Sequence, residues 1–163
     1  EDTLPSVLGK LLLGKNNTIG TVESCTAGAL AKSIVSVSGS SAYFHGSILT
    51  YSNELKKKLV HVTSESIDKY GAVSQEVIEQ MAINGREILG VDWCISTSGV
   101  AGPDGGSEEK PVGTIWIAIA NKENVFSKQF YFGNNRERNI EMAVLTALNL
   151  ARCKILGILS EKN

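Results

Sequence analysis

Apolar residues recur every three or four positions in six segments of the chain, the spacing that places them on one face of a helix. The first segment follows the candidate caps Asp2 and Thr3 and runs from Leu4 to the stop signal Gly14. The other predicted helices cover 24–35, 53–59, 74–90 and 135–156, with one more that begins at Thr63 or Ser64. Asn53 is the expected N-cap of the helix through Leu55 and Leu59.

Five shorter runs, richer in β-branched and aromatic residues, lie between these helices and predict strands. They cover 18–23, 47–51, 93–98, 114–120 and 125–132. The early strands alternate with helices, whereas the last two are joined through 121–124 and predict an antiparallel hairpin. The fold class expected from this order is α/β: a three-layer α/β/α sandwich with a mixed sheet that includes a C-terminal antiparallel hairpin.

The length and composition fit one folded domain. The chain has 163 residues, of which 42% are hydrophobic and 20% charged, enough apolar mass for one core and too short for two full domains. We therefore expect a single domain over 1–163. Because the sequence begins at Glu1 rather than at methionine, this domain is also compatible with the C-terminal part of a longer chain.

Charge and composition argue against several classes of partner. Sixteen Lys and Arg against seventeen Asp and Glu leave a net charge of −1, without the basic excess that nucleic-acid binding favours. No run approaches the roughly 18 apolar residues of a membrane span, and the start lacks the layout of a secretion signal. Three widely spaced cysteines and two histidines indicate neither a disulfide framework nor a metal site. We expect a cytoplasmic protein without a metal, nucleic-acid or membrane partner.

Polar residues gather where three of the predicted strands end. The segments are Glu23–Thr26, Thr50–Asn53 and Ser98–Gly102. In open α/β sheets ligands bind at the carboxyl ends of the strands, so we look for chemistry in these three segments.

Ser24 lies where the first strand turns into a helix, beside backbone N–H groups that have no partner within the helix. This position suits a nucleophile next to an oxyanion hole, made by the helix-N-terminal amides around Thr26 to Gly28. It equally suits a simple N-cap made by Ser24 or Thr26, and the sequence leaves both interpretations open. Cys25 is a rival nucleophile, because a helix N-terminus lowers a thiol pKa, or else a small buried hydrophobe.

A serine without a suitably spaced histidine needs another base, and a lysine is the candidate. Lys56 belongs to a run of three lysines that also fits a solvated helix face. If Leu55 and Leu59 form the buried stripe, Lys57 points away from it while Lys56 and Lys58 flank it. A lysine base must be neutral, so its pKa has to fall well below the usual value of about 10.4.

Three further side chains are candidates beside this pair. Tyr51, at the end of the second strand, is placed to relay a proton or to fix the lysine. Arg136 and Arg138 suit a phosphate and are equally consistent with surface charges. The glycine-rich segment 99–106 can bring backbone N–H groups close to an anion, although it lacks the pattern of a P-loop.

Five short motifs share the order and spacing of one family. They are ESCTAG at 23–28, TYSNELK at 50–56, GAVS at 71–74, GVAGPDGG at 99–106 and KPVGT at 110–114. Together they resemble the CinA C-terminal domain family, also called the nicotinamide mononucleotide amidase family, from about residue 18 to 150. The resemblance implies an α/β/α sandwich that assembles as a homodimer or larger homo-oligomer, alone or at the end of a longer chain.

The resemblance also implies an amidohydrolase that converts nicotinamide mononucleotide to nicotinic acid mononucleotide and ammonia, without a metal or other cofactor. The family's serine nucleophile falls on Ser24, its tyrosine on Tyr51 and its lysine on Lys56. The residues expected to bind this nucleotide substrate are Thr26, Ala27, Gly28, Asn53, Ser98, Gly99, Ala101, Arg136 and Arg138.

The chain departs from the family pattern at three positions. Members commonly have glycine at the position of Ala27 and threonine at that of Ser98. A second arginine is usual four residues after Arg136, where this chain has Ile140, so Arg138 is the expected substitute. These departures leave a second hypothesis open, a nucleotide-binding accessory domain with little or no turnover.

Overall fold

The strands of the structure, a computed structural model that describes residues 1–158, form one mixed sheet. β1 (Ile19–Glu23) lies between β2 (Phe44–Leu49) and β3 (Trp93–Gly99) and runs parallel to both. β4 (Thr114–Ala120) and β5 (Val125–Tyr131) follow as antiparallel neighbours, in the order β2-β1-β3-β4-β5. The expected mixed sheet with a C-terminal hairpin is confirmed.

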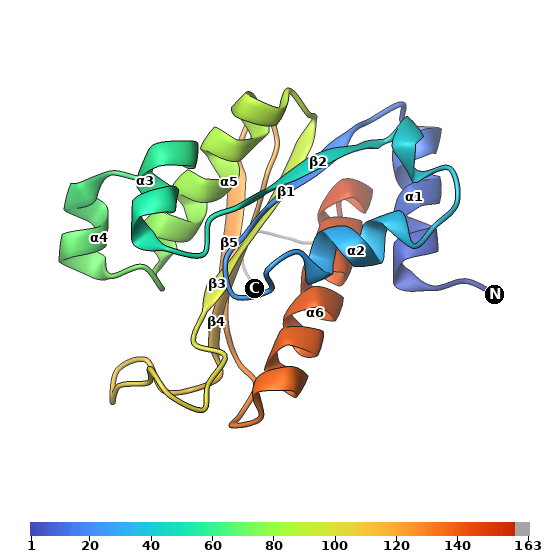
Figure 1. Cartoon of the computed structure of the whole chain (residues 1–163). Coiled ribbons are helices and arrows are strands. Elements are labelled where there is room, and N and C mark those ends of the chain that lie inside the picture. The colour runs from blue at the N-terminus through green and yellow to red at the C-terminus, as the bar shows by residue number, and fades with distance from the viewer. Residues whose placement is uncertain (159–163) are drawn as a thin grey trace.

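Helices cover both faces of this sheet (Figure 1). One face carries α1 (Leu4–Gly14), α2 (Ala29–Val35) and α6 (Arg136–Leu156), and the other carries α3 (Asn53–Val60), α4 (Ser64–Tyr70) and α5 (Gln75–Leu89). A short 3-10 helix, Ser40–Ala42, leads from α2 into β2. The three-layer α/β/α sandwich is therefore confirmed. Within residues 1–158, none of the helices has both the length and the apolar character needed to cross a membrane.

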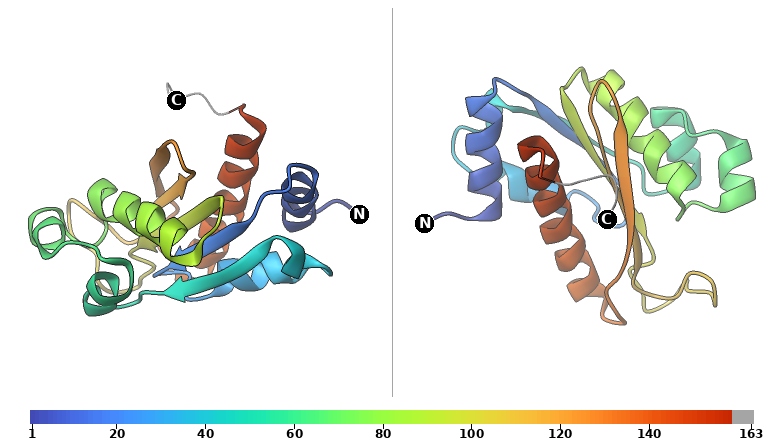
Figure 2. Two further views of the ribbon diagram at one scale, coloured as in Figure 1. Left: turned by 90° about the horizontal axis from the view of Figure 1, so that it is seen from above. Right: turned by 180° about the vertical axis from the view of Figure 1, so that it is seen from behind.

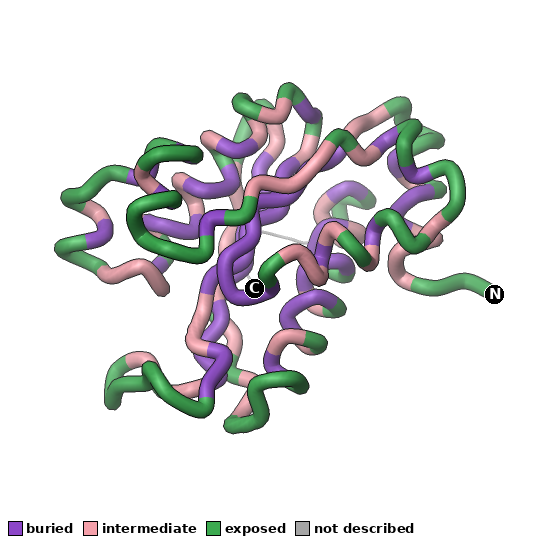
Figure 3. Tube along the Cα trace, viewed as in Figure 1, coloured by how far each residue is buried: buried purple, intermediate pink, exposed green. Residues whose placement is uncertain are grey.

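Side chains of β4 alternate between two cores. Ile115, Ile117 and Ile119 pack toward α1, α2 and α6, whereas Ala118 and Ala120 pack toward α3, α4 and α5. Such alternation is required of a strand that is covered on both faces. Figure 3 shows buried positions along the strands and along the inner sides of the helices.

Five strand ends meet at one edge of the sheet. The carboxyl ends of β1, β2 and β3 coincide because these strands are parallel. Antiparallel pairing of Gly99 with Ile115 and of Thr114 with Tyr131 brings the start of β4 and the end of β5 to the same edge. The long 100–113 connection and the first turn of α6 therefore lie there as well (Figure 2).

Two predicted boundaries are wrong. The helix expected to start at Ser24 starts at Ala29, because residues 24–28 form a separate turn. The strand expected at 47–51 is β2 at 44–49, and the chain leaves the sheet before Tyr51.

The buried face of α3 is also different from the expected one. Lys56 and Val60 are the buried residues, whereas Leu55 and Leu59 are 37% and 38% exposed. A hydrophobic pattern assigns a lysine to the solvent face, and consecutive helix positions differ by about 100°. The leucine stripe therefore predicts a helix rotated by one residue from the real one.

α5 packs tightly against β1 at Gly85, where an added Cβ would lie 2.2 Å from Cγ2 of Val22. We expect Gly85→Ala to lower the free energy of unfolding by about 1–3 kcal/mol, because a packed core has to shift even though alanine favours the helix. Chemical denaturation measures the change. The control is Gly14→Ala in α1, whose new Cβ meets nothing within 4 Å. Equal losses in both variants would contradict the packing argument.

Candidate active site

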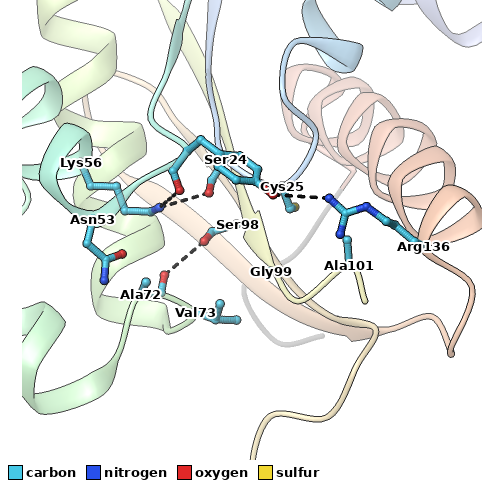
Figure 4. A pocket seen from close by; sticks show the side chains of 11 residues that line it. Ser24, Cys25, Asn53, Lys56, Ala72, Val73, Ser98, Gly99, Ala101 and Arg136 are labelled. Atoms are coloured by element: carbon cyan, nitrogen blue, oxygen red, sulfur yellow. Dashed lines mark hydrogen bonds between the residues drawn. The ribbon is translucent and has the colours of Figure 1, made fainter. Parts of the chain in front are cut away.

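A pocket of about 240 Å³ opens at the edge where the strand ends meet (Figure 4). Its walls are the turn after β1, the start of α3, the α4–α5 loop, the end of β3 and the first residue of α6. The lining residues are Ser24, Cys25, Tyr51, Asn53, Lys56, Ala72, Val73, Ser98, Gly99, Ala101 and Arg136. The structure thus brings most of the expected site residues together. Thr26, Ala27, Gly28 and Arg138 do not line the pocket.

Lys56 is a buried amine, only 2% exposed. Its Nζ donates to the carbonyl oxygens of Thr50 at 3.0 Å and Tyr51 at 3.3 Å, and lies 3.1 Å from Oγ of Ser24. Burial lowers the pKa of Lys56 because water no longer stabilises the ammonium form. The lysine base expected from the sequence is therefore beside the expected nucleophile.

The two carbonyl groups also orient the amine. A protonated lysine has three N–H donors, which fit the oxygens of Thr50, Tyr51 and Ser24. A neutral amine keeps only two donors, and the carbonyl groups can only accept. Its lone pair is therefore left for the Ser24 hydroxyl proton, the arrangement of a nucleophile with its base.

The helix that carries Lys56 is capped by Ser52. The Ser52 hydroxyl accepts a hydrogen bond from the N–H of Leu55 at 3.1 Å and is the N-cap, so the cap expected at Asn53 is wrong. Asn53 is instead the first residue of α3, and its side chain lines the pocket (Figure 4).

Ser24 is held in the turn between β1 and α2. Its N–H donates to the Thr97 carbonyl of β3 at 3.0 Å, and its carbonyl accepts from the N–H of Ala27 at 3.0 Å. The Ser24 hydroxyl meets Lys56, and the N-cap of α2 is Gly28. The interpretation of Ser24 or Thr26 as the helix cap is therefore wrong.

The first N–H groups of α2 are already used inside the fold. The buried Glu23 carboxylate accepts from the N–H groups of Gly28, Leu30 and Ala31 at 3.0–3.1 Å. The expected oxyanion role of the amides from Thr26 to Gly28 therefore fails for Ala27 and Gly28, whose N–H groups have acceptors within the turn. Glu23 itself supports the site from outside the pocket lining, a role that the sequence patterns did not reveal, although a carboxylate at the end of an otherwise uncharged strand is a signal for it.

Cys25 also lines the pocket, but as a thiol. Burial raises its pKa to about 12, partly countered by the backbone N–H groups of Cys25 and Thr26. At pH 7 such a thiol is ionised in only about one molecule in 100,000. Cys25 is 5% exposed and packs in the hydrophobic core, which favours its interpretation as a small buried hydrophobe.

Arg136 and Tyr51 lie together on the solvent side of the pocket. Nη1 of Arg136 donates to the Gly102 carbonyl at 2.6 Å, and Nη2 lies 3.4 Å from the Tyr51 hydroxyl. Tyr51 therefore contacts Lys56 through its backbone carbonyl while its hydroxyl faces Arg136. Arg138 is exposed and outside the lining.

Side-chain to backbone hydrogen bonds hold the pocket floor. The Ser98 hydroxyl donates to the Ala72 carbonyl at 3.1 Å and joins β3 to the α4–α5 loop. Asn139 of α6 is fully buried and donates from Nδ2 to the carbonyl groups of Ala101 and Gly133, at 3.0 and 2.9 Å. Nothing in the local sequence distinguishes Asn139 from an ordinary polar residue of a helix.

A sequence profile of the CinA C-terminal domain matches residues 1–155. The chain belongs to this family. A CinA-like protein of Cytophaga hutchinsonii is 49% identical over 151 residues, 93% of this chain and 36% of the relative. One from Prochlorococcus marinus (strain MIT 9215) is 50% identical over 159 residues, 96% of this chain and 38% of the relative. The chain thus spans less than two fifths of the length of these curated relatives.

Solved CinA structures share the fold. A CinA superfamily protein from Klebsiella pneumoniae superposes with a TM-score of 0.91 at 27% identity, covering 94% of this chain and 96% of the other. The competence/damage inducible protein CihA from Agrobacterium tumefaciens gives 0.87 at 29% identity, covering 92% and 94%.

The structure gives a physical reason for the glycine that the family resemblance leads us to expect at the position of Ala27. Ala27 has φ +46°, in the left-handed region, and is followed by Gly28 at φ +95°. This conformation costs an alanine about 1–2 kcal/mol. The turn therefore forms with alanine at some cost in stability, and Ala27 is exposed rather than crowding the pocket.

We expect iodoacetamide to alkylate Cys153 well before Cys25 and Cys94 in the folded protein. Cys153 is partly exposed, whereas burial raises the pKa of each of the other two to about 12. Mass spectrometry with peptide mapping at pH 8 follows the order of labelling, and denatured protein provides the control in which all three react. Rapid labelling of Cys25 in the folded protein would contradict this arrangement and support a thiol nucleophile.

Proposed function

We propose that this CinA domain is an amidohydrolase that cleaves the carboxamide of nicotinamide mononucleotide, with Ser24 as nucleophile and Lys56 as general base. The observation that carries the proposal is the buried Lys56 amine, held by two carbonyl groups 3.1 Å from the Ser24 hydroxyl in the wall of a pocket. The family resemblance supplies the substrate, and the geometry supports acyl transfer.

The reaction starts from neutral Lys56. Oγ of Ser24 attacks the carboxamide carbon while Nζ of Lys56 takes the hydroxyl proton. We assign the oxyanion to the N–H groups of Cys25 and Thr26, which directly follow the nucleophile in the chain and are not among the donors to Glu23.

The same lysine completes the cycle. The ammonium group of Lys56 returns the proton to the departing nitrogen, and the C–N bond breaks. Ammonia departs, and the acyl group stays bonded to Oγ of Ser24. Water then attacks this ester as Lys56 again takes a proton, and breakdown of the second intermediate releases the acid and restores the Ser24 hydroxyl.

Arg136 suits the phosphate of the substrate. It is exposed at the pocket, and its bond to Gly102 fixes the guanidinium beside the Tyr51 hydroxyl. Arg138, the alternative expected from the sequence, lies outside the lining, so we assign the phosphate to Arg136.

An inert binding domain would gain little from this arrangement. Burying an amine costs free energy that a leucine or methionine at the same position of α3 would not cost. Perturbed titratable groups in a pocket are more typical of catalytic sites, which favours the amidase over the accessory-domain hypothesis.

We expect Ser24→Ala to lower ammonia release from nicotinamide mononucleotide at least about a thousandfold, and Lys56→Met to lower it by about 10²–10⁴. The parent's rate should rise with pH as Lys56 loses its proton, with a midpoint below that of an ordinary lysine because burial lowers its pKa. The matched control is Lys58→Met on the exposed side of α3, which should keep parental activity. A folded parent that releases no ammonia would contradict the proposal.

The phosphate assignment has its own test. We expect Arg136→Ala to raise KM for nicotinamide mononucleotide by about ten- to a hundredfold, since a charge-assisted contact is lost. Cleavage of nicotinamide riboside, which has no phosphate, should change little. Arg138→Ala serves as the control. A rise in KM in Arg138→Ala but not in Arg136→Ala would contradict the assignment.

A further inference from the structure

Glu23 precedes the nucleophile and takes no part in the proposed proton transfers. It is fully buried, and six donors lie within 3.1 Å of its carboxylate. Oε1 faces the Thr26 hydroxyl at 2.7 Å and the N–H groups of Gly28 and Leu30. Oε2 faces the N–H of Ala31 and the hydroxyl groups of Thr21 and Ser47. The donors to Oε1 all belong to the segment that directly follows Ser24.

Thr26 connects this carboxylate to the neighbouring strand. Its Oγ1 lies 2.7 Å from Oε1 of Glu23 and 2.8 Å from Oγ1 of Thr97. A carboxylate only accepts, so the single hydroxyl proton of Thr26 goes to Glu23. The Thr97 hydroxyl must then donate to the Thr26 hydroxyl. The hydrogen bonds therefore run from Thr97 to Thr26 and from Thr26 to Glu23.

Thr97 holds the nucleophile's turn at two points. Its carbonyl accepts the N–H of Ser24 at 3.0 Å, and its hydroxyl bonds Thr26 two residues further on. The turn is therefore bonded to β3 through the N–H of Ser24 and again, two residues later, through the Thr26 hydroxyl. Catalytic geometry is sensitive to this kind of support, because a displacement of about 1 Å can lower a rate about a hundredfold.

We propose that Thr26, held by the Glu23 carboxylate, is a positioning residue that fixes the Ser24 turn against β3 and keeps the Ser24 hydroxyl within reach of Lys56. The positioning role belongs to the Thr26 side chain, which acts through Ser24 and is separate from the oxyanion contact assigned to the Thr26 backbone N–H. This inference rests on the proposed function only in taking Ser24 as the nucleophile, and it is independent of which amide is cleaved.

The test measures nucleophilicity without the substrate. A fluorophosphonate reacts with an activated serine: the serine oxygen bonds to phosphorus, fluoride leaves, and the base takes the hydroxyl proton. Intact-mass spectrometry gives the labelling rate constant at Ser24, with Ser24→Ala as the blank. Thermal unfolding of each variant shows how far stability has changed.

Two variants each remove one hydroxyl donor from Glu23. Thr26→Val removes the donor on the Ser24 turn, and Ser47→Ala removes the donor on β2, far from that turn in the sequence. We expect Thr26→Val to label about ten- to a hundredfold more slowly, Thr26→Ser to recover most of the parental rate, and Ser47→Ala to stay within about threefold of it. If Thr26→Val does not fold, Thr97→Val removes the hydroxyl that donates to Thr26 and should also slow labelling of Ser24.

The outcomes separate this inference from the proposed function. If the parent is labelled and Thr26→Val is labelled at the same rate, the positioning role is overturned. It is also overturned if Thr26→Val and Ser47→Ala lose labelling rate equally and in proportion to their loss of thermal stability. A labelled parent that releases no ammonia from nicotinamide mononucleotide overturns the substrate and leaves the positioning role standing. A folded parent that is not labelled at Ser24 overturns both.

Discussion

The burial of one amine is the constraint on which the site depends. A lysine that is 2% exposed loses most of its hydration, and the fold compensates with three oxygen atoms around Nζ. Two of these are the backbone carbonyl groups of Thr50 and Tyr51, directly after β2, so their positions follow from the main chain and not from a flexible side chain. The third is the nucleophile. The interactions that keep the lysine inside the protein therefore also aim it at Ser24.

The sheet topology explains why so few residues are enough to build this pocket. Parallel strands β1, β2 and β3 deliver the nucleophile turn, the carbonyl groups for the base and the pocket floor to one edge. The antiparallel hairpin then returns the chain to that edge, so α6 begins there with Arg136. Arg136 and Asn139, on the first turn of α6, hold the carbonyl groups of Gly102 and Ala101. The helix that covers one face of the sheet thus also fixes the pocket floor.

Sequence reasoning predicts this fold well because the central strands β1, β3 and β4 are mostly buried and every α-helix except α2 begins with a side-chain cap. The isoleucine positions of β4 and the capping hydroxyls of Thr3, Thr63 and Ser74 are local signals, and local signals survive in one sequence. The position of Lys56 is different. Its local environment predicts a solvent-facing side chain, and its burial depends on strand-end carbonyl groups that the folded sheet brings to it. Family resemblance, which carries information about the folded site, selected Lys56 where helical periodicity left it equivalent to Lys58.

The sequence also fails to predict the turn at 24–28, where it indicates the start of a helix with free amides. A single carboxylate changes that outcome, since Glu23 binds the amides of α2 before any substrate can. All six of its close donors are N–H or hydroxyl groups, so the carboxylate is stabilised by dipoles and not by Lys56. This separation has a chemical consequence. A carboxylate paired with Lys56 would favour the ammonium form and raise the pKa of the lysine. Because the N–H groups of α2 and the hydroxyl groups around it stabilise the Glu23 carboxylate, that carboxylate does not need Lys56 as a partner. Burial then lowers the pKa of Lys56 and leaves a usable base beside the serine.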